Sequence, residues 1–178
     1  MTSVSNNPLP DNRIAAMALL VAMGVVLHRL EALLPLPSPW IKLGLANIMT
    51  LIALVFMGIK EAVLVAVLRV LLASLFGGTF LSPTFFLSLA GTLAATLTMA
   101  AVYRKGNSPF SLVGVSVAAA YGHTLAVVLC VYILFIRQEA FLQLLPVFLS
   151  LALVSGILTG TAANILNQRL VEERVSFK

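Results

Sequence analysis

Charge is scarce in this chain of 178 residues, since 10% of them are charged where a soluble domain carries roughly 25%. Asp11 is the only aspartate and Cys130 the only cysteine. The single cysteine excludes an internal disulfide and a metal site built from several cysteines. His, Cys and carboxylate residues form no ligand set along the sequence, so we expect neither a metal site nor a cofactor.

The motifs of two enzyme classes are also missing from the sequence. No glycine-rich loop ends in Lys-Ser or Lys-Thr, so the chain does not hydrolyse ATP by that route. No cluster of carboxylates is present to hold Mg²⁺ around a diphosphate. We therefore do not expect an enzyme active site within this chain alone.

What the sequence does contain is long uncharged runs. Hydrophobic residues make up 61% of the chain, and its mean hydropathy is +1.08. A helix needs about 20 apolar residues to cross the hydrocarbon of a bilayer. The runs are continuous and do not alternate as barrel strands do, which predicts an all-α integral membrane protein. They are free of charge over residues 70–103, 106–136 and 140–168.

Six transmembrane helices account for the sequence between a polar N-terminus, residues 1–12, and a polar tail, residues 169–178. Prolines at 35, 37 and 39 prevent regular helix after the first span. Adjacent glycines at 77 and 78 end the third span. The transmembrane domain, residues 13–168, is predicted to contain helices over about 13–34, 43–57, 60–76, 83–103, 110–136 and 141–168.

The positions of Lys and Arg predict the orientation of the helices. With the N-terminus inside, the inner loops hold seven basic residues and the outer loops three, which favours both termini in the cytoplasm of a bacterial cell and a place in its inner membrane. The net charge of +5 is spread over helix ends, so it indicates topology and contact with the lipid bilayer, not nucleic-acid binding. The inner set is Arg13, Lys60, Arg104, Lys105, Arg169, Arg174 and Lys178, and the outer set is Arg29, Lys42 and Arg137.

The first outer loop and the start of the second helix read PLPSPWIKLGLANI, residues 35–48. Trp40 is suited to the membrane interface, as an anchor or as a lid over a site. Lys42 and Asn47 lie about one and a half turns apart if the helix begins near residue 43. For Lys42 the alternative to ligand binding is a lysine that reaches to the interface, and for Asn47 it is a hydrogen bond between helices.

Arg69 is the clearest polar residue inside a predicted span, where a charge is costly and indicates function by default. It lies eight residues after Glu61, about 12 Å along a helix, so Glu61 cannot be its partner. Its acceptors are expected among backbone carbonyls, Ser74, Ser88, Asn47 or an anionic ligand. The alternative is a structural clamp between helices.

These residues together predict a pocket that opens to the outside. If the second and third helices form a hairpin, Asn47 and Arg69 reach a similar depth, with Lys42 above them near the mouth. The start of the second helix adds free N–H groups and a positive dipole end. The predicted ligand is a small anion or a strongly polar head group.

Two further polar residues, Glu31 and His123, each allow two interpretations. Glu31, at the end of the first span, either joins the site or forms a surface ion pair with Lys42 or Arg29. His123 either touches substrate or carries protons, or is a hydrogen-bonded packing residue. Small residues that allow close helix approach recur along three of the predicted helices, at Ala18 and Ala22, at Ser88, Gly91, Thr92 and Thr96, and at Gly156 and Gly160.

Two longer runs carry a resemblance to a known family. EALLPLPSPWIKLGLANIMTL, residues 31–51, and RVLLASLFGGTFLSPTFFLSLAG, residues 69–91, resemble the heptaprenyl diphosphate synthase component I family, also called the Gx transporter family. The resemblance covers most of the chain, from the first helix to the sixth. Trp40 departs from it, because the family pattern has glycine before Ile-Lys.

The two family names imply different functions. The transporter name implies the fold of a substrate-binding (S) component of an energy-coupling factor transporter, driven by a coupling subunit and partner ATPases. The substrate then lies under the first and third loops, here PLPSPW with Trp40 and GGTFLSP with Thr79. Ala18 and Ala22 match the face that contacts the coupling subunit. We expect an isoprenoid- or quinone-related precursor, or a vitamin-like compound, as substrate.

Two rival functions remain open at this point. The synthase name implies a membrane scaffold for a soluble prenyl diphosphate synthase, in which Arg104, Lys105 and the C-terminal tail matter most. The other rival is a solitary carrier driven by protons, with His123 or Glu31 as the coupling group.

Overall fold

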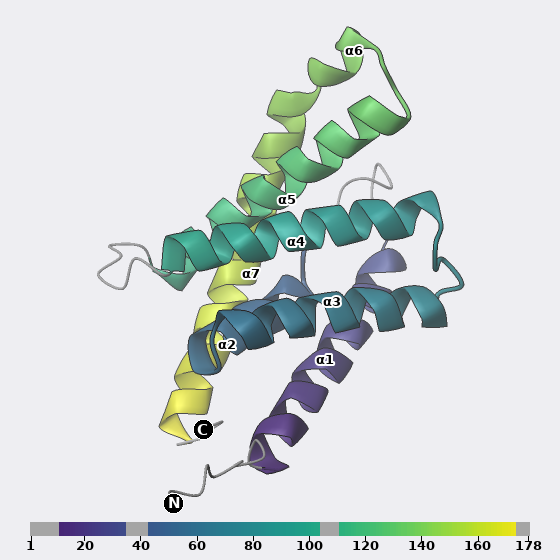
Figure 1. Cartoon of the computed structure of the whole chain (residues 1–178). Helices are drawn as coiled ribbons and strands as arrows, with labels where there is room; N and C mark the ends of the chain where they lie inside the picture. The colour runs from purple at the N-terminus through teal and green to yellow at the C-terminus, as the bar shows by residue number, and fades with distance from the viewer. Residues whose placement is uncertain (1–10, 35–42, 104–110, 174–178) are drawn as a thin grey trace, which may run out of the picture.

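The computed structural model describes residues 11–34, 43–103 and 111–173, and all regular structure in these ranges is helical (Figure 1). Six of these described helices have ten residues or more, and one, α6, is a single turn. In chain order they are α1 Asp11–Ala32, α2 Asn47–Phe56, α3 Ile59–Phe76, α4 Pro83–Tyr103, α5 Leu112–Leu134, α6 Glu139–Leu142 and α7 Leu145–Glu172.

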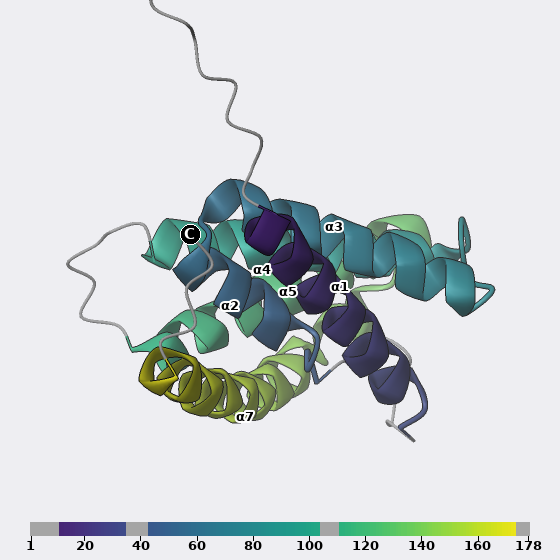
Figure 2. The same cartoon turned by 90° about the horizontal axis from the view of Figure 1, so that it is seen from below.

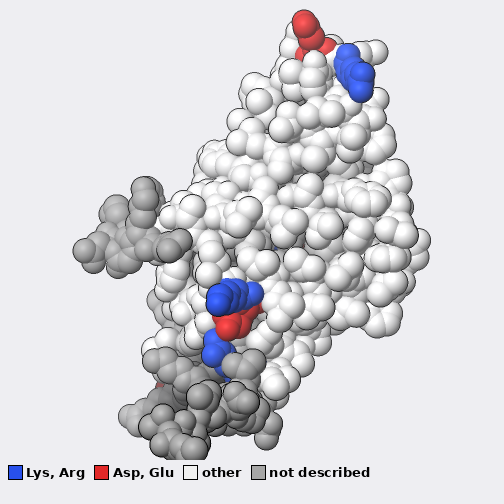
Figure 3. Space-filling model, in the orientation of Figure 1, with Lys and Arg blue, Asp and Glu red and all other residues white. Residues whose placement is uncertain are grey.

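The described helices form a multi-pass membrane protein. Four segments are long and apolar enough to cross a bilayer, namely Arg13–Ala32, Pro83–Tyr103, Leu112–Leu134 and Glu139–Glu172. On the face drawn in Figure 3, charged side chains gather towards two opposite ends, and the surface between them is almost free of charge. This distribution suits helices whose ends reach the water on either side of a bilayer.

The prediction for the second helix was wrong at its start. Residues 43–46 are not helical, and α2 begins at Asn47, so Lys42 and Asn47 do not share a helix. Gly44 has φ 71°, a left-handed conformation that interrupts a helix. The remaining ten residues measure about 15 Å, half of the hydrocarbon thickness. α2 is buried among α1, α3, α4 and α7, as the view from below shows (Figure 2).

The last predicted helix is also divided in the structure. α6 ends at Leu142, and α7 starts at Leu145 and continues to Glu172, four residues beyond the predicted end. Pro146 lies in the first turn of α7, where its missing N–H removes no bond inside the helix. The same missing N–H prevents one continuous helix through this region, because it would leave the carbonyl of Leu142 without a donor.

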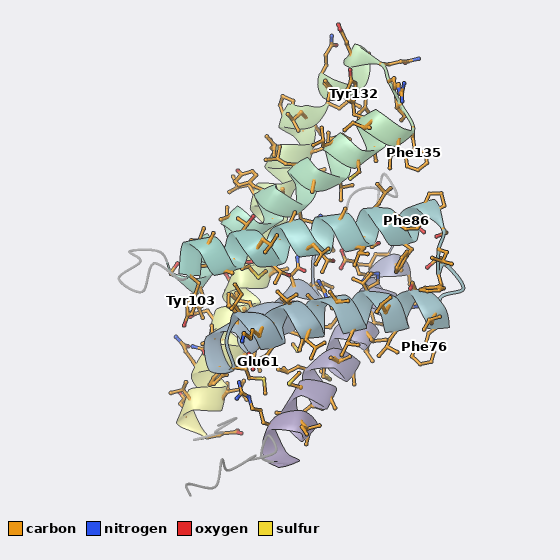
Figure 4. The ribbon with its side chains drawn as sticks, in the orientation of Figure 1. Glu61, Phe76, Phe86, Tyr103, Tyr132 and Phe135 are labelled. Atoms are coloured by element: carbon orange, nitrogen blue, oxygen red, sulfur yellow. The ribbon has the colours of Figure 1, made fainter. Side chains whose placement is uncertain are left out.

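Two contacts tie the ends of α1 and α3 together. At one end Arg13 donates to Glu61 Oε1 at 2.6 Å and to the Met57 carbonyl at 3.1 Å. At the other end the Arg29 guanidinium lies directly against Gly77, and a Cβ at this position would require the end of the arginine side chain to move. Glu61 and Phe76 mark these opposite ends of α3 in Figure 4. The starts of α1 and α3 therefore lie on one side of the bundle.

The close helix approach expected at Gly156 and Gly160 is confirmed. A Cβ on Gly156 would lie 2.7 Å from the Cα of Val117, and a Cβ on Gly160 would lie 2.7 Å from the Cα of Val113. Both glycines thus let the backbones of α5 and α7 touch. The two helices form a hairpin with α6 at its tip (Figure 1).

Replacing Gly160 by leucine should separate α5 from α7. We expect Gly160→Leu to lower the free energy of unfolding in detergent by about 1–3 kcal/mol, because the contacted atom is backbone and cannot turn away. Ala162→Leu, on the exposed side of the same helix, is the matched control and should leave stability nearly unchanged. Equal thermal unfolding of the two variants would contradict this packing.

Candidate functional site

Arg69 is the buried centre of the helix bundle, with 2% of its surface exposed. Its Nη2 donates to Asn47 Oδ1 at 2.5 Å and to Thr92 Oγ1 at 3.4 Å, which joins α3 to α2 and α4. Its Nε is buried without a partner in the described part of the chain. Asn47 is one of the acceptors that the sequence suggested, whereas Ser74 and Ser88 donate to carbonyls of their own helices.

Residues of α1 complete the surroundings of Arg69. A Cβ on Gly24 would lie 3.2 Å from Arg69 Cδ, so this glycine leaves room for the arginine stem. Glu31 is 6% exposed, and its opposite charge acts on Arg69. Glu31 Oε1 also accepts from the backbone N–H of Gly44 at 2.8 Å. α1 thereby contributes both space and compensating charge.

Glu31 therefore does not form the ion pair with Arg29 that was considered for it. It is buried, and no ion pair with Arg29 exists among the described residues. Instead it fixes the non-helical segment before α2 to the end of α1 through the Gly44 N–H. Lys42, the other partner considered, lies outside the described residues, as does Trp40.

A small pocket lies beside this centre, between the segment before α2 and the helices α5 and α7. The space enclosed by its walls is about 10 Å³, room for one water molecule, and the larger empty volume of about 290 Å³ includes open solvent at the mouth. Asn47 belongs to its wall, so the pocket and Arg69 share one side chain. No lining residue within the described ranges is charged. The lining is Leu43, Gly44, Asn47, Ser116, Ala120, His123, Thr124, Ser155 and Thr159.

Hydroxyl groups connect the two helices on the far wall of the pocket. Ser116 Oγ on α5 and Thr159 Oγ1 on α7 are 2.9 Å apart. Thr159 donates to the Ser155 carbonyl at 2.8 Å, and Ser155 donates to the Ala152 carbonyl at 3.1 Å. This wall is therefore polar and internally bonded.

His123 reaches the pocket from the middle of α5. It also packs against α4, where a Cβ on Gly91 would lie 2.6 Å from His123 Nε2. Thr92, the next residue, accepts from Arg69, so α4 contacts both the histidine and the arginine through adjacent residues. The arrangement can recognise a small polar group by hydrogen bonds from several helices.

The remaining predicted residues do not line the pocket. Thr79 lies in the turn between α3 and α4, with its N–H bonded to the Ser74 carbonyl at 2.9 Å. Ser88 is buried on α4 and donates to the Thr84 carbonyl at 2.7 Å. Ala18 and Ala22 lie on the exposed face of α1, away from the core. They are available to lipid or to a partner.

Several lining residues were missed by the sequence analysis. Thr124 and the hydroxyls of Ser116, Ser155 and Thr159 gave no distinct signal, because Ser and Thr are common on membrane helices. Ser155 and Thr159 are four residues apart and flank Gly156, so their position on the close-packed face of α7 was available as a signal. The role of Thr92 as an acceptor for Arg69 was also missed.

The comparisons with known proteins agree with this architecture. The sequence model of the heptaprenyl diphosphate synthase component I family matches residues 20–166. No curated protein matches the chain. The solved S component of a bacterial ECF transporter superposes with a TM-score of 0.72 at 21% identity, over 92% of this chain and 97% of that one. The S-component-like fold expected from the resemblance is thus confirmed.

The bond between Arg69 and Asn47 should dominate stability at this site. Asn47→Leu leaves a buried guanidinium without its main acceptor, so we expect a loss of about 3–5 kcal/mol in the free energy of unfolding. The double variant Arg69→Met/Asn47→Leu should lose less than the sum of the two single losses.

Denaturant unfolding in detergent measures this double-mutant cycle. Arg137→Met is the control, because Arg137 is exposed and bonds only to the Ile133 carbonyl among the described residues. Strictly additive losses from the two single changes would show that the two side chains do not interact.

Proposed function

We propose that this chain, which belongs to the heptaprenyl diphosphate synthase component I family, is the substrate-binding component of a transporter that takes up a small molecule. It resembles the S component of a bacterial ECF transporter in fold. We place it in the bacterial inner membrane, where it binds its substrate from the outer face. Uptake is driven by ATP hydrolysis in partner subunits.

The observation that supports this proposal is a polar pocket that lies next to the buried guanidinium of Arg69. Asn47 lines the pocket and accepts from Arg69, which itself bonds to α4 and packs on α1. A buried arginine inside a membrane bundle is costly to keep unless it serves a site. Gly44 of the pocket wall bonds to Glu31 at the end of α1, the end that the basic residues assign to the exterior.

The energy for transport is assigned to other proteins. The sequence has no nucleotide-binding loop of the Walker type, and its resemblance is to a component of a larger transporter. Ala18 and Ala22 give α1 an exposed face of small side chains that lets another helix approach closely. We assign this face to a coupling subunit, which links the chain to a pair of ATPases.

The substrate is proposed to be an isoprenoid- or quinone-related precursor or a vitamin-like compound. The pocket combines several hydroxyls, an amide and an imidazole with apolar surroundings. The space enclosed by the described walls is about 10 Å³, room for a group the size of a water molecule, whereas ligand sites usually measure about 300–1,000 Å³. A single hydroxyl or amide group of the substrate is therefore proposed to enter between the walls, and the rest of the substrate would extend towards the mouth.

A solitary carrier driven by protons is the second candidate function. It is favoured by the position of His123 in the pocket wall, because histidine changes its charge near neutral pH. Such a carrier predicts transport in liposomes that contain no ATPase. The scaffold function, by contrast, predicts a soluble prenyl diphosphate synthase as the bound partner.

Purification of the tagged protein from its own host in mild detergent tests these functions. We expect a coupling subunit and ATPases to co-purify, and mass spectrometry identifies them together with any small molecule retained. A prenyl diphosphate synthase without ATPases would instead support the scaffold. A chain that purifies with neither would contradict the proposed function and leave the solitary carrier.

Two sets of variants should separate substrate binding from partner binding in the same experiment. Asn47→Asp keeps an acceptor for Arg69 but removes the amide donor, so the retained small molecule should fall about tenfold or more while the partners stay bound. Ala18→Leu/Ala22→Leu should release the partners and keep the small molecule. Ala162→Leu, an exposed control on α7, should change neither quantity.

A further inference from the structure

We infer that the pocket takes an uncharged head group that both donates and accepts hydrogen bonds, with Asn47 as a donor on one wall and the hydroxyl oxygens of α5 and α7 as acceptors on the other. This inference rests on the proposed function and adds the chemical class of the substrate. It selects the strongly polar head group from the two ligands that the sequence predicted, a small anion or such a head group.

The wall formed by α5 and α7 presents acceptors, because its hydroxyl protons are already in use. Ser155 donates its proton to the Ala152 carbonyl, and Thr159 donates its proton to the Ser155 carbonyl. The contact between Ser116 and Thr159, at 2.9 Å, must then use the proton of Ser116. What these three hydroxyls offer a ligand is oxygen lone pairs, which favour a donor and repel an anion.

The opposite wall presents a donor. Asn47 Oδ1 is occupied by Arg69 Nη2, which leaves the amide nitrogen Nδ2 with its two protons. Nδ2 points to Gly44, since a Cβ on that residue would lie 3.2 Å from it, and Gly44 also lines the pocket. No described residue accepts a bond from Nδ2. A ligand carbonyl or hydroxyl oxygen is the missing acceptor.

The two buried charges near the pocket do not supply an anion site. Arg69 and Glu31 are 2% and 6% exposed, neither belongs to the described lining, and their opposite charges act on each other. Arg69 Nη2 is also directed at Asn47 and Thr92. A carboxylate or phosphate in the pocket would therefore meet the lone pairs of three hydroxyls on one side and one neutral amide on the other, with the Thr124 hydroxyl and the His123 imidazole as the remaining polar groups of the lining.

A primary alcohol, an amide or a ureide has the required pattern, because each carries both an N–H or O–H donor and an oxygen acceptor. Such groups occur on the neutral forms of the substrate classes proposed above. Their anionic relatives lack the donor that the α5–α7 wall requires. We accordingly expect the charge of a ligand to affect its binding to the pocket more strongly than its shape does.

Thiol labelling in the pocket tests this selectivity without a known substrate. Thr124→Cys is made in a Cys130→Ala background, because Thr124 lines the pocket and has a size close to cysteine. The full-length protein in detergent is treated with 2-hydroxyethyl methanethiosulfonate, which is neutral, or with 2-sulfonatoethyl methanethiosulfonate, which is anionic. Gln138→Cys, exposed between α5 and α6, gives the intrinsic rate ratio of the two reagents.

We expect the ratio of neutral to anionic labelling rates at position 124 to exceed the ratio at position 138 by about tenfold or more. Ala120→Cys, one turn earlier in the same wall, should give the same result. It replaces Thr124→Cys in the experiment if that variant does not fold. An equal ratio, or faster anionic labelling in the pocket, overturns the uncharged class and leaves the proposed function standing. If both pocket variants fold and neither reagent reacts, the pocket is not open to solution, which contradicts the proposed function as well.

Discussion

The structure depends on how one buried guanidinium is accommodated. Arg69 lies in a bundle whose surface faces lipid, so its charge and its N–H groups must be satisfied inside the protein. Asn47 and Thr92 accept from it, Gly24 leaves space for its stem, and Glu31 supplies the opposite charge. These partners come from α1, α2 and α4, so the packing of three helices is set by one side chain of α3. The short α2 lies in the core, where its apolar side chains are buried and its first residue, Asn47, is the main acceptor for Arg69.

The pocket forms where this charge-centred group meets the hairpin of α5 and α7. The α5–α7 hairpin is stabilised without a buried charge. Glycines bring its two backbones into contact, and the hydroxyls of Ser116 and Thr159 bond to each other. One wall is thus fixed through Arg69 and the other through backbone packing. Asn47 and the hydroxyls of Ser116, Ser155 and Thr159 are each held by a hydrogen bond within the protein.

The fold could be predicted in large part from the sequence, because an uncharged run of 20 residues or more can cross a bilayer in few backbone structures, chiefly the α-helix. Arg69 could also be predicted as the central polar residue, and Asn47 as one of its acceptors. The start of α2 could not, because the left-handed Gly44 and its bond to Glu31 join residues 13 positions apart. The acceptor wall could not either, since the contact between Ser116 and Thr159 depends on how α5 and α7 pack, whereas Ser155 and Thr159 donate to carbonyls of their own helix. Lys42 and Trp40 lie outside the described residues, so their roles stay predictions.

An experimental structure of the protein, purified together with the small molecule that its host supplies, would test the assignment of the pocket as the substrate site. We expect that molecule between α2, α5 and α7, with an oxygen within hydrogen-bonding distance of Asn47 Nδ2 and a donor facing Ser116 or Ser155. Arg69 should keep its bond to Asn47 Oδ1 in that complex. A molecule bound at the opposite end, near Arg13 and Glu61, with the pocket empty, would contradict this assignment.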